Sequence, residues 1–445
     1  MDYKSSITSL IRSPSPPGGD SAPPAPAHPP TATLNNLPPQ AVLVKSEPLP
    51  GQAGADVDSP LAGQKEVKGH DFSRSRNLDD ILGAMLTTGY QATSFGRAAV
   101  ELERMTQWRL SDDPPPEPGA PGSPADGKTG GWDPEGPFSD PATRERTGAV
   151  LFLAFTSNLI SSGVRETLVY LAKHRMFDVL VTTAGGVEED LIKCLAPTYT
   201  GDFHLRGADL RKRGLNRIGN LLVPNDNYCS FEDWLRPIVE SMCAEQEASN
   251  PADPADRVNW TPSKIIDRLG AEMSRHPRGD ESVYAWCHRN DIPVFCPALT
   301  DGSIGDMLYF HTYKAGPGRH LRCDIVEDVR RMNDLAVRAS PRRTGVVVLG
   351  GGVPKHHCFN ANLMRNGADF CVIVTTATDH DGSDSGAAPD EAKSWGKLRA
   401  ECRAQKVVGD ATILWPLLVS QTFAKTWWDR PRATARPATA GPTGG

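Results

Sequence analysis

The sequence contains no Cys-x-x-Cys pair, no long apolar run and no excess of positive charge. Its nine cysteines are an odd number and lie apart from one another, which argues against a zinc site and a disulfide framework. No apolar run approaches the roughly 18 residues of a membrane span, and the N-terminus lacks the apolar stretch of a secretory signal. The formal net charge of −6 argues against a protein that binds nucleic acid. We therefore expect a reduced, soluble, cytoplasmic protein without a metal site or a membrane partner.

Proline and glycine are concentrated in segments with few apolar side chains. Residues 1–68 (for example PSPPGGDSAPPAPAHPP) and 111–146 (for example DDPPPEPGAPGSPADG) cannot bury enough apolar surface to offset the entropy of an ordered chain. We expect both segments, and the tail 429–445, to be disordered. One globular domain is expected over 69–428, with 111–146 as an insertion in it.

Short apolar runs alternate with helical patterns through this domain. The expected strands are short, apolar and largely free of charge, and they cover residues 149–155, 177–182, 293–296, 345–349 and 370–374. Helices are expected between them, for example over 164–173, 261–274 and 324–339. Strands that alternate with helices predict an α/β fold with a parallel, doubly wound sheet and right-handed crossovers.

Three expected strands end in turns of small residues that lead into helices. These turns are Thr156–Gly163, Thr183–Gly186 and Gly350–Gly352. Backbone N–H groups at such turns can bind the phosphates of a nucleotide. The alternative is that any βα unit needs small residues at its turn, and the three consecutive glycines do not form the GxGxxG fingerprint. The pattern alone leaves both interpretations open.

The expected strand 370–374 runs into a strongly acidic loop. The stretch VTTATDHDGSDSGAAPDEAKSWGK carries five carboxylates, followed by Trp395 and Lys397. Crowded carboxylates repel one another unless a cation lies among them. A polyamine would suit, because its ammonium groups match carboxylates and its methylene stem can lie on the Trp395 ring. The alternative is a solvated acidic loop before a surface helix that begins at Pro389.

The segment DHDGSDSGAAPDEAKSWGKLR resembles the active-site segment of the deoxyhypusine synthase family, and the resemblance extends from about Gly69 to Phe423. It implies a Rossmann-like fold, in which helices flank a doubly wound parallel sheet, similar to the fold of sirtuins. It also implies NAD as the cofactor, and spermidine and the translation initiation factor five-A precursor as substrates. The family's sites lie between the subunits of a homotetramer.

The resemblance also implies roles for individual residues. Those that match the NAD site are Ser157, Asn158, Leu159, Ile160, Ser161, Thr183, Ala184, Gly185, Glu189, Asp301, Gly351, Thr376, Ala377, Asp381, Ser385, Asp410 and Ala411. Those that match the polyamine site are Glu188, Glu189, Asp306, His356, Gly382, Ser383, Asp384, Glu391, Trp395 and Lys397. Glu188 could instead favour the positive end of a helix.

Lys397 and His356 match the catalytic residues of the family. In the implied reaction NAD oxidises spermidine to an imine, and Lys397 attacks it and expels 1,3-diaminopropane. A lysine of the protein acceptor then displaces Lys397, and hydride returns to give deoxyhypusine. The hypothesis requires the Lys397 amine to be partly desolvated and to lie near the glycine turn and the acidic cluster. His356 could take a proton from the polyamine, and its neighbour His357 points about 100° away on a helix.

Two rival functions fit the same residues. Homospermidine synthase is derived from this family and uses putrescine as the acceptor. A regulatory paralogue would bind NAD and activate a partner subunit without catalysis, and such proteins usually lack the lysine. Here Lys397 stands in an intact SWGK motif.

Overall fold

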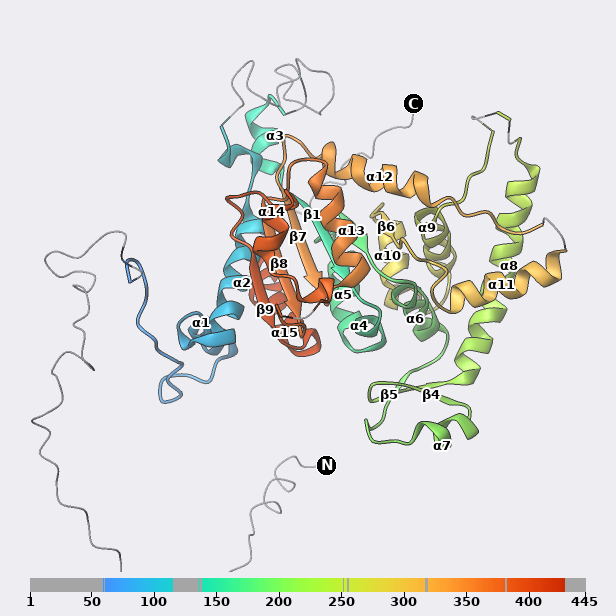
Figure 1. Ribbon diagram of the computed structural model, residues 1–445, viewed down its shortest axis with the longest axis horizontal. Coiled ribbons are helices and arrows are strands. Elements are labelled where there is room, and N and C mark those ends of the chain that lie inside the picture. The colour runs from blue at the N-terminus through green and yellow to red at the C-terminus, as the bar shows by residue number, and fades with distance from the viewer. Residues whose placement is uncertain are drawn as a thin grey trace, which may run out of the picture. The chain divides into compact units, whose positions relative to one another are not determined.

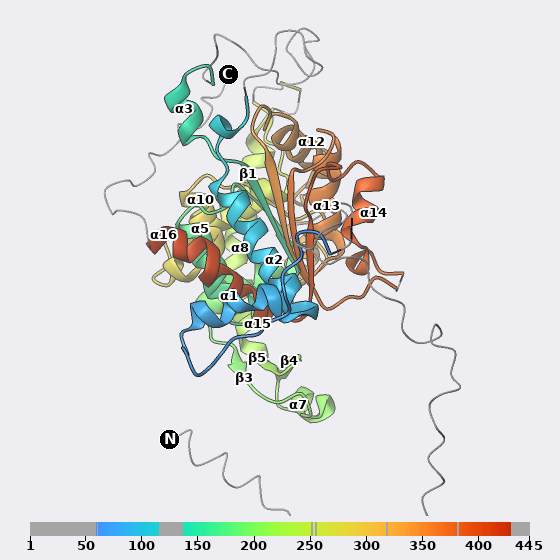
Figure 2. The same cartoon turned by 90° about the vertical axis from the view of Figure 1, so that its left-hand side faces the viewer.

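The computed structural model describes residues 59, 61–114, 136, 138–250, 252–253, 256–316, 319–380 and 382–428. The chain divides into the units Met1–Lys65 and Glu66–Gly445. Nearly all described residues, which are drawn in colour in Figures 1 and 2, belong to the second unit. Most of the arm predicted over 1–68, most of the insertion predicted over 111–146 and the whole tail 429–445 lie outside the described residues.

A six-stranded parallel sheet lies at the centre of the second unit (Figure 1). Its strands are β1 (Val150–Phe155), β2 (Val179–Val181), β6 (Val294–Phe295), β7 (Thr344–Leu349), β8 (Phe370–Thr375) and β9 (Gln405–Val408). Their order is β6-β2-β1-β7-β8-β9, and all neighbouring pairs are parallel. Numbered along the chain this is 3-2-1-4-5-6, the order of the doubly wound Rossmann fold. The winding direction reverses between β1 and β7, and ligands of such sheets bind at the carboxyl ends of the strands there.

Helices connect the strands and cover the sheet. In chain order they are α1 (Leu78–Thr88), α2 (Tyr90–Gln107), α3 (Pro141–Arg146), α4 (Asn158–Ser161), α5 (Val164–Lys173), α6 (Ala184–Leu195), α7 (Gly207–Lys212), α8 (Asn225–Ala248), α9 (Pro262–Met273), α10 (Val283–Arg289), α11 (Ser303–Ala315), α12 (Ile325–Val337), α13 (Gly352–Leu363), α14 (Pro389–Ser394), α15 (Ala411–Val419) and α16 (Lys425–Trp428). Short helical turns are η2 (Leu110–Asp112), η4 (Gly279–Glu281), η5 (Asp384–Gly386) and the π-helical η6 (Ser420–Ala424). In the described part of the chain, no helix combines the length and the apolar character that a membrane crossing requires.

Both faces of the sheet are buried. Successive side chains of each strand point to opposite faces, and both sets pack into apolar clusters. In β1, Leu151, Leu153 and Phe155 belong to one apolar cluster, and Phe152 and Ala154 belong to the other. Figure 2 shows α12, α13 and α14 on one side of the sheet and α1, α2, α5 and α15 on the other. Strands covered on both faces have nearly continuous apolar sequences, which explains why the five predicted strands could be found.

The helical pattern predicted from residue 72 to about 110 is divided between two helices. Gly89 separates α1 from α2 and adopts a φ of 103°, a conformation that only glycine tolerates readily. The predicted start of α9 is confirmed: Thr261 caps the helix by accepting the N–H of Lys264, and Pro262 occupies the first turn.

A small antiparallel sheet precedes α8 and was not predicted. It has the order β3 (Tyr199–Thr200), β5 (Leu221–Pro224) and β4 (Leu215–Ile218). Its strands are two to four residues long and mostly half-exposed or exposed, so they lack a recognisable apolar run. The sheet leads directly into α8, which reaches the candidate site.

The predicted disorder over 111–146 was wrong at its C-terminal end, where α3 forms. Asp140 caps this helix by accepting the N–H of Thr143 over 2.8 Å. Arg144 is buried and donates to the carbonyl oxygens of Leu110 and Asp113. The composition of the segment did not reveal this helix, because the helix is anchored by one buried arginine and has no apolar stripe.

Candidate active site

Most of the predicted cofactor residues meet at one edge of the sheet (Figure 1). They lie in the segments that follow the carboxyl ends of the strands: Ser157–Ser161 after β1, Thr183–Gly185 after β2, Asp301 after β6, Gly351 after β7, Thr376, Ala377 and Ser385 after β8, and Asp410 and Ala411 after β9. Asp381 lies outside the described residues. The edge includes the point between β1 and β7 where the winding reverses.

The turns after β1, β2 and β7 pack so closely that side chains are excluded from them. A Cβ atom on Gly185 would lie 2.9 Å from the Cβ of Ser157, and one on Gly351 would overlap the side chain of Ser385. Gly350 adopts a φ of 91°, which favours glycine. Glycine is therefore needed at these positions, and glycine-rich turns at helix N-termini are where the phosphates of a dinucleotide bind in this type of fold.

Two adjacent carboxylates on α6 are buried and have different partners. Glu188 accepts the N–H of Ile304, at the start of α11, over 2.9 Å. Glu189 Oε1 accepts the hydroxyl of Tyr228, on α8, over 2.9 Å, and its Oε2 has no hydrogen-bond partner among the described residues. Burial raises the pKa of both carboxyl groups, although their hydrogen bonds act in the opposite direction. Glu188 does stabilise a helix N-terminus, but that of α11 and not of its own helix.

Asp306 lies near the two buried carboxylates. It occupies the first turn of α11, is exposed, and contributes to the raised pKa of Glu188 through its negative charge. The fold therefore gathers three predicted polyamine ligands, Glu188, Glu189 and Asp306, where α6 and α11 meet.

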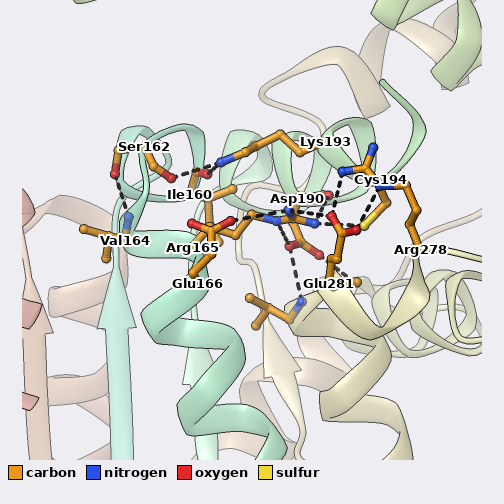
Figure 3. A network of polar contacts seen from close by, with 12 residues as sticks. Ile160, Ser162, Val164, Arg165, Glu166, Asp190, Lys193, Cys194, Arg278 and Glu281 are labelled. Atoms are coloured by element: carbon orange, nitrogen blue, oxygen red, sulfur yellow. Dashed lines mark hydrogen bonds and ion pairs between the residues drawn. The ribbon is translucent and has the colours of Figure 1, made fainter. Parts of the chain in front are cut away.

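A buried ion pair holds α6 against α5 and the start of α10 (Figure 3). Arg165 Nε donates to Asp190 Oδ1 over 2.7 Å, and Arg165 also donates to Cys194 Sγ over 2.8 Å. Asp190 accepts the hydroxyl of Ser282 over 2.6 Å as well. Buried charges are tolerated when their remaining hydrogen-bonding groups are satisfied in this way. The network therefore fixes the helix that carries Glu189.

Lys193 links the same helix to the turn after β1. Its Nζ donates to the carbonyl oxygens of Ile160, Ser161 and Ser162 over 3.1, 3.3 and 3.0 Å (Figure 3). These carbonyls end α4, where a positive charge is favoured. Burial lowers the pKa of Lys193. One side chain thus connects the predicted cofactor turn with the helix that carries the buried carboxylates.

The acidic loop after β8 is held by lysines other than Lys397. Lys355 is buried on α13 and donates to the carbonyl oxygen of Asp384. Lys406 on β9 forms an ion pair with Asp379, and its ammonium group lowers the pKa of that carboxyl. Part of the predicted cluster of negative charge is therefore balanced by the chain itself.

The two adjacent histidines face different surroundings, as predicted. His356 Nδ1 lies 3.5 Å from Asp384 Oδ1 at the acidic loop. His357 packs near the ring of Phe295, with the ring centroids 6.3 Å apart, and burial lowers its pKa. His356 is therefore the histidine that can reach a ligand of the acidic loop.

Lys397 lies near the opposite edge of the sheet from the glycine turn. Its carbonyl oxygen accepts the N–H of Ala368, which precedes β8, whereas Gly351 follows the carboxyl end of β7. The six residues of β8 separate the two edges by about 20 Å. The Lys397 side chain is half-buried, and its Nζ lies 5.6 Å from the centroid of the Trp395 ring, which is 64% exposed. Within one chain the expected proximity of this amine to the glycine turn was therefore wrong.

The remaining predicted polyamine residues are on the surface. Gly382 and Ser383 lie in the acidic loop, and Glu391 lies in the first turn of α14; all three are exposed. In the described part of the chain, no group of three or more His, Cys, Asp or Glu side chains could hold a metal ion. Tyr228 and Lys193 contact predicted site residues but were not predicted, because neither belongs to a motif.

The strand order, the close-packed turns at the reversal point and the nearby carboxylates define a Rossmann-like α/β protein with a candidate dinucleotide site. Residues 80–422 match the family described as deoxyhypusine synthase. The chain is 52% identical over 359 residues to deoxyhypusine synthase of Senecio vernalis, a match that covers 81% of this chain and 89% of that protein. It is 53% identical, with the same coverage, to homospermidine synthase 2 of Senecio vernalis.

A crystal structure of a proposed deoxyhypusine synthase from Entamoeba histolytica has a similar fold. The TM-score is 0.55 at 29% sequence identity, and the match covers 80% of this chain and 97% of that one. The chain belongs to the deoxyhypusine synthase family. This membership supports a transferase activity.

Proposed function

We propose that the protein transfers the 4-aminobutyl group of spermidine to one lysine of the translation initiation factor five-A precursor, which forms deoxyhypusine. The observation that carries this proposal is Lys397 beside the Trp395 ring, within an intact SWGK segment of a chain 52% identical to a deoxyhypusine synthase. The acidic side chains around the site support a polycationic substrate, because ammonium groups pair with carboxylates.

NAD suits the turns at the carboxyl edge of the sheet, because glycine-containing turns there lead into the N-termini of α6 and α13, whose backbone N–H groups can bind phosphates. The residues that would hold it are Ser157–Ser161, Thr183–Gly185, Gly351, Ser385, Asp410 and Ala411. NAD, when bound, would supply the oxidation of the polyamine carbon beside the secondary amine and the later reduction of the product.

Lys397 is the proposed nucleophile. Its amine attacks the oxidised carbon and expels 1,3-diaminopropane, so that the aminobutyl group is held on the enzyme until the acceptor lysine displaces Lys397. The Trp395 ring covers one side of the amine and can carry the methylene stem of the polyamine. His356, beside Asp384, would take a proton from the secondary amine.

The proposed site combines two copies of the chain. Group transfer requires the reacting atoms to be in contact, yet Lys397 and the glycine turn lie near opposite edges of one sheet. We therefore expect a homo-oligomer, as the implied homotetramer would provide, in which the Lys397 end of one copy faces the glycine turn of another.

Subunit mixing tests this arrangement. Lys397→Ala and Gly351→Trp variants should each be inactive, whereas oligomers that contain both should regain part of the activity through sites that combine the intact halves. Unmixed variants refolded in parallel are the controls. Mixed oligomers without activity would contradict the two-copy site.

Homospermidine synthase remains the second candidate, because a relative with this activity is as similar as the deoxyhypusine synthases. Purified protein should be incubated with spermidine and NAD, and with either the precursor protein or putrescine as acceptor. We expect the aminobutyl group on the protein acceptor. Transfer to putrescine alone would replace the proposed function with the second candidate.

Borohydride trapping tests the covalent step. Reduction during turnover with labelled spermidine should fix the label on the enzyme, and peptide mapping should place it on Lys397. Label on another lysine would overturn the proposed role of Lys397 without excluding the overall reaction.

A further inference from the structure

Glu189 is an unusual carboxylate because it is buried and only one of its two oxygens has a hydrogen-bond partner among the described residues. Its side chain lies on α6, only 4% of the residue is exposed, and Oε2 has no hydrogen-bond partner among the described residues. A buried carboxylate oxygen without a protein partner is satisfied by a proton, an ordered water or a bound cation. Under the proposed function, that cation is an ammonium group of the polyamine.

Tyr228 provides the hydrogen bond that the other oxygen accepts. Its hydroxyl, in the first turn of α8, donates to Glu189 Oε1 over 2.9 Å. The neighbouring Glu188 is held differently, by the backbone N–H of Ile304. We infer that Tyr228 is a positioning residue for the proposed reaction: it holds Glu189 in its ionised form, with Oε2 left for a polyamine ammonium group. This inference rests on the proposed function.

The charges near Glu189 do not replace this hydroxyl. On α6 itself, Glu188 opposes ionisation of Glu189 and Lys193 favours it, but the Lys193 ammonium is bonded to the carbonyls that end α4. The exposed Asp306 of α11 adds negative charge near Glu188.

The Arg236 side chain of α8 and the Lys314 side chain of α11 form ion pairs elsewhere, with Asp233 and Glu232. α4 has no ionisable side chain. The Arg165 side chain of α5 is paired with Asp190, and Tyr284 of α10 donates its hydroxyl to the carbonyl oxygen of Gly186. Tyr228 is thus the neutral donor on which the charge of Glu189 depends.

Loss of the hydroxyl should therefore act through the protonation of Glu189. Burial already raises the pKa of this carboxyl, and the Tyr228 hydrogen bond lowers it. Without the hydroxyl the pKa rises further, so a larger fraction of Glu189 is protonated at neutral pH and attracts an ammonium group less. At high pH the carboxylate forms again, and binding should recover.

The test measures spermidine binding by calorimetry without NAD, so that no turnover occurs, from pH 6 to pH 9. Tyr228→Phe should weaken binding by about tenfold at neutral pH, since hydrogen bonds to charged groups are the strong ones. The loss should shrink as the pH rises. Tyr170→Phe is the matched control, because the buried Tyr170 hydroxyl has no partner among the described residues and should be dispensable.

A double-mutant cycle separates positioning from a general structural role. In a Glu189→Gln background, which cannot ionise, Tyr228→Phe should cause little further loss. An equal loss at all pH values, or an equal loss in both backgrounds, would overturn the inference. If Tyr228→Phe does not fold, the Glu189→Gln protein tests the ionisation on which the inference depends. Its spermidine binding should no longer weaken as the pH falls. Binding that still weakens at low pH would also overturn the inference. Wild-type protein that binds no spermidine at any pH would instead refute the proposed function.

Discussion

The buried carboxylates on α6 and the carboxylates of the loop after β8 are the same kind of residue in opposite surroundings. On α6, Glu188 and Glu189 are almost fully buried, and burial raises their pKa values. In the loop, Asp379 is half-exposed, and the Lys406 ammonium lowers its pKa. Burial thus favours the neutral form of the first pair, whereas the neighbouring ammonium favours the charged form of Asp379.

The two regions also differ in how they are held in place. The helix α6 is fixed by the fully buried pair of Arg165 and Asp190. The loop is held at its margins by Lys355 and Lys406, which contact its backbone. Under the proposed function, the desolvated carboxylates of α6 and the exposed charged loop would offer a polycation two different kinds of anionic partner.

The largest effect is expected at Lys397, because neither the buried nor the exposed carboxylates can replace a nucleophilic amine. Lys397→Ala should lower turnover by about 10³-fold or more, because the covalent step is lost. NAD binding should be retained, since the proposed cofactor residues lie in the turns after the strands and Lys397 is proposed to act on the polyamine. Lys393→Ala on the same segment is the control, because Lys393 bonds only to the carbonyl oxygen of Ala400 among the described residues. Retained turnover in Lys397→Ala would contradict the mechanism.

The anchor of α6 can be broken by Asp190→Ala. This change leaves Arg165 buried without its partner, and we expect a loss of about 3–5 kcal/mol in the free energy of unfolding. The matched change Asp209→Ala removes an exposed partner of Arg206, 3.7 Å away, and should cost less than about 0.5 kcal/mol. Urea unfolding of both variants measures the contrast. Similar losses in the two would show that burial does not distinguish the pairs.

The substitution Glu189→Gln should change how the melting temperature depends on pH, which separates the buried carboxylates from the exposed ones. Because burial raises the pKa of Glu189, ionisation opposes folding, and glutamine should raise the melting temperature by a few degrees at neutral pH. The gain should vanish below the usual glutamate value of about 4.3, where the wild-type carboxyl is protonated in both states. Melting curves from pH 4 to pH 8 test this. A rise in melting temperature that does not depend on pH would show that the loss of the ionisable group is not its cause.

The smallest effect is expected in the acidic loop. The lowered pKa of Asp379 means that its ion pair with Lys406 stabilises the fold above the usual aspartate pKa, and that this is lost as the pH falls through the lowered value. Asp379→Asn should therefore cost less than about 1 kcal/mol at neutral pH, since the Asp379 carboxylate is half-exposed, and nothing in strong acid. Asp390→Asn serves as the control. Chemical unfolding at pH 7 and at low pH compares the two.

The central strands could be predicted because their burial on both faces leaves continuous apolar runs. β9 could not, since this edge strand has the sequence QKVV and carries Lys406 toward the acidic loop. The antiparallel β3, β4 and β5 are too short and too exposed to give a periodic signal. The strands could therefore be predicted where they are buried and apolar. They were missed where they are short or polar.

The position of the predicted cofactor residues at one edge of the sheet could be inferred wherever a turn directly follows a strand. The residues that support the site could not be inferred, because Tyr228 lies 39 residues from Glu189 and Lys193 lies 31 residues from Ser162, with no local pattern that connects them. The position of Lys397 depends on the direction in which α14 runs, which no residue near the SWGK motif reveals. Sequence thus predicts candidate groups, and the fold determines which of them meet.

The separation of Lys397 from the glycine turn has a consequence for how such a protein can diverge. If each reaction centre is shared between two copies, a duplicated chain that loses the lysine still lends an intact cofactor edge to a normal neighbour. Such a mixed assembly would keep half of its composite centres, and the altered copy could drift toward a purely supporting role. In that case the length of one β-strand would let the two ends of the molecule evolve under separate constraints.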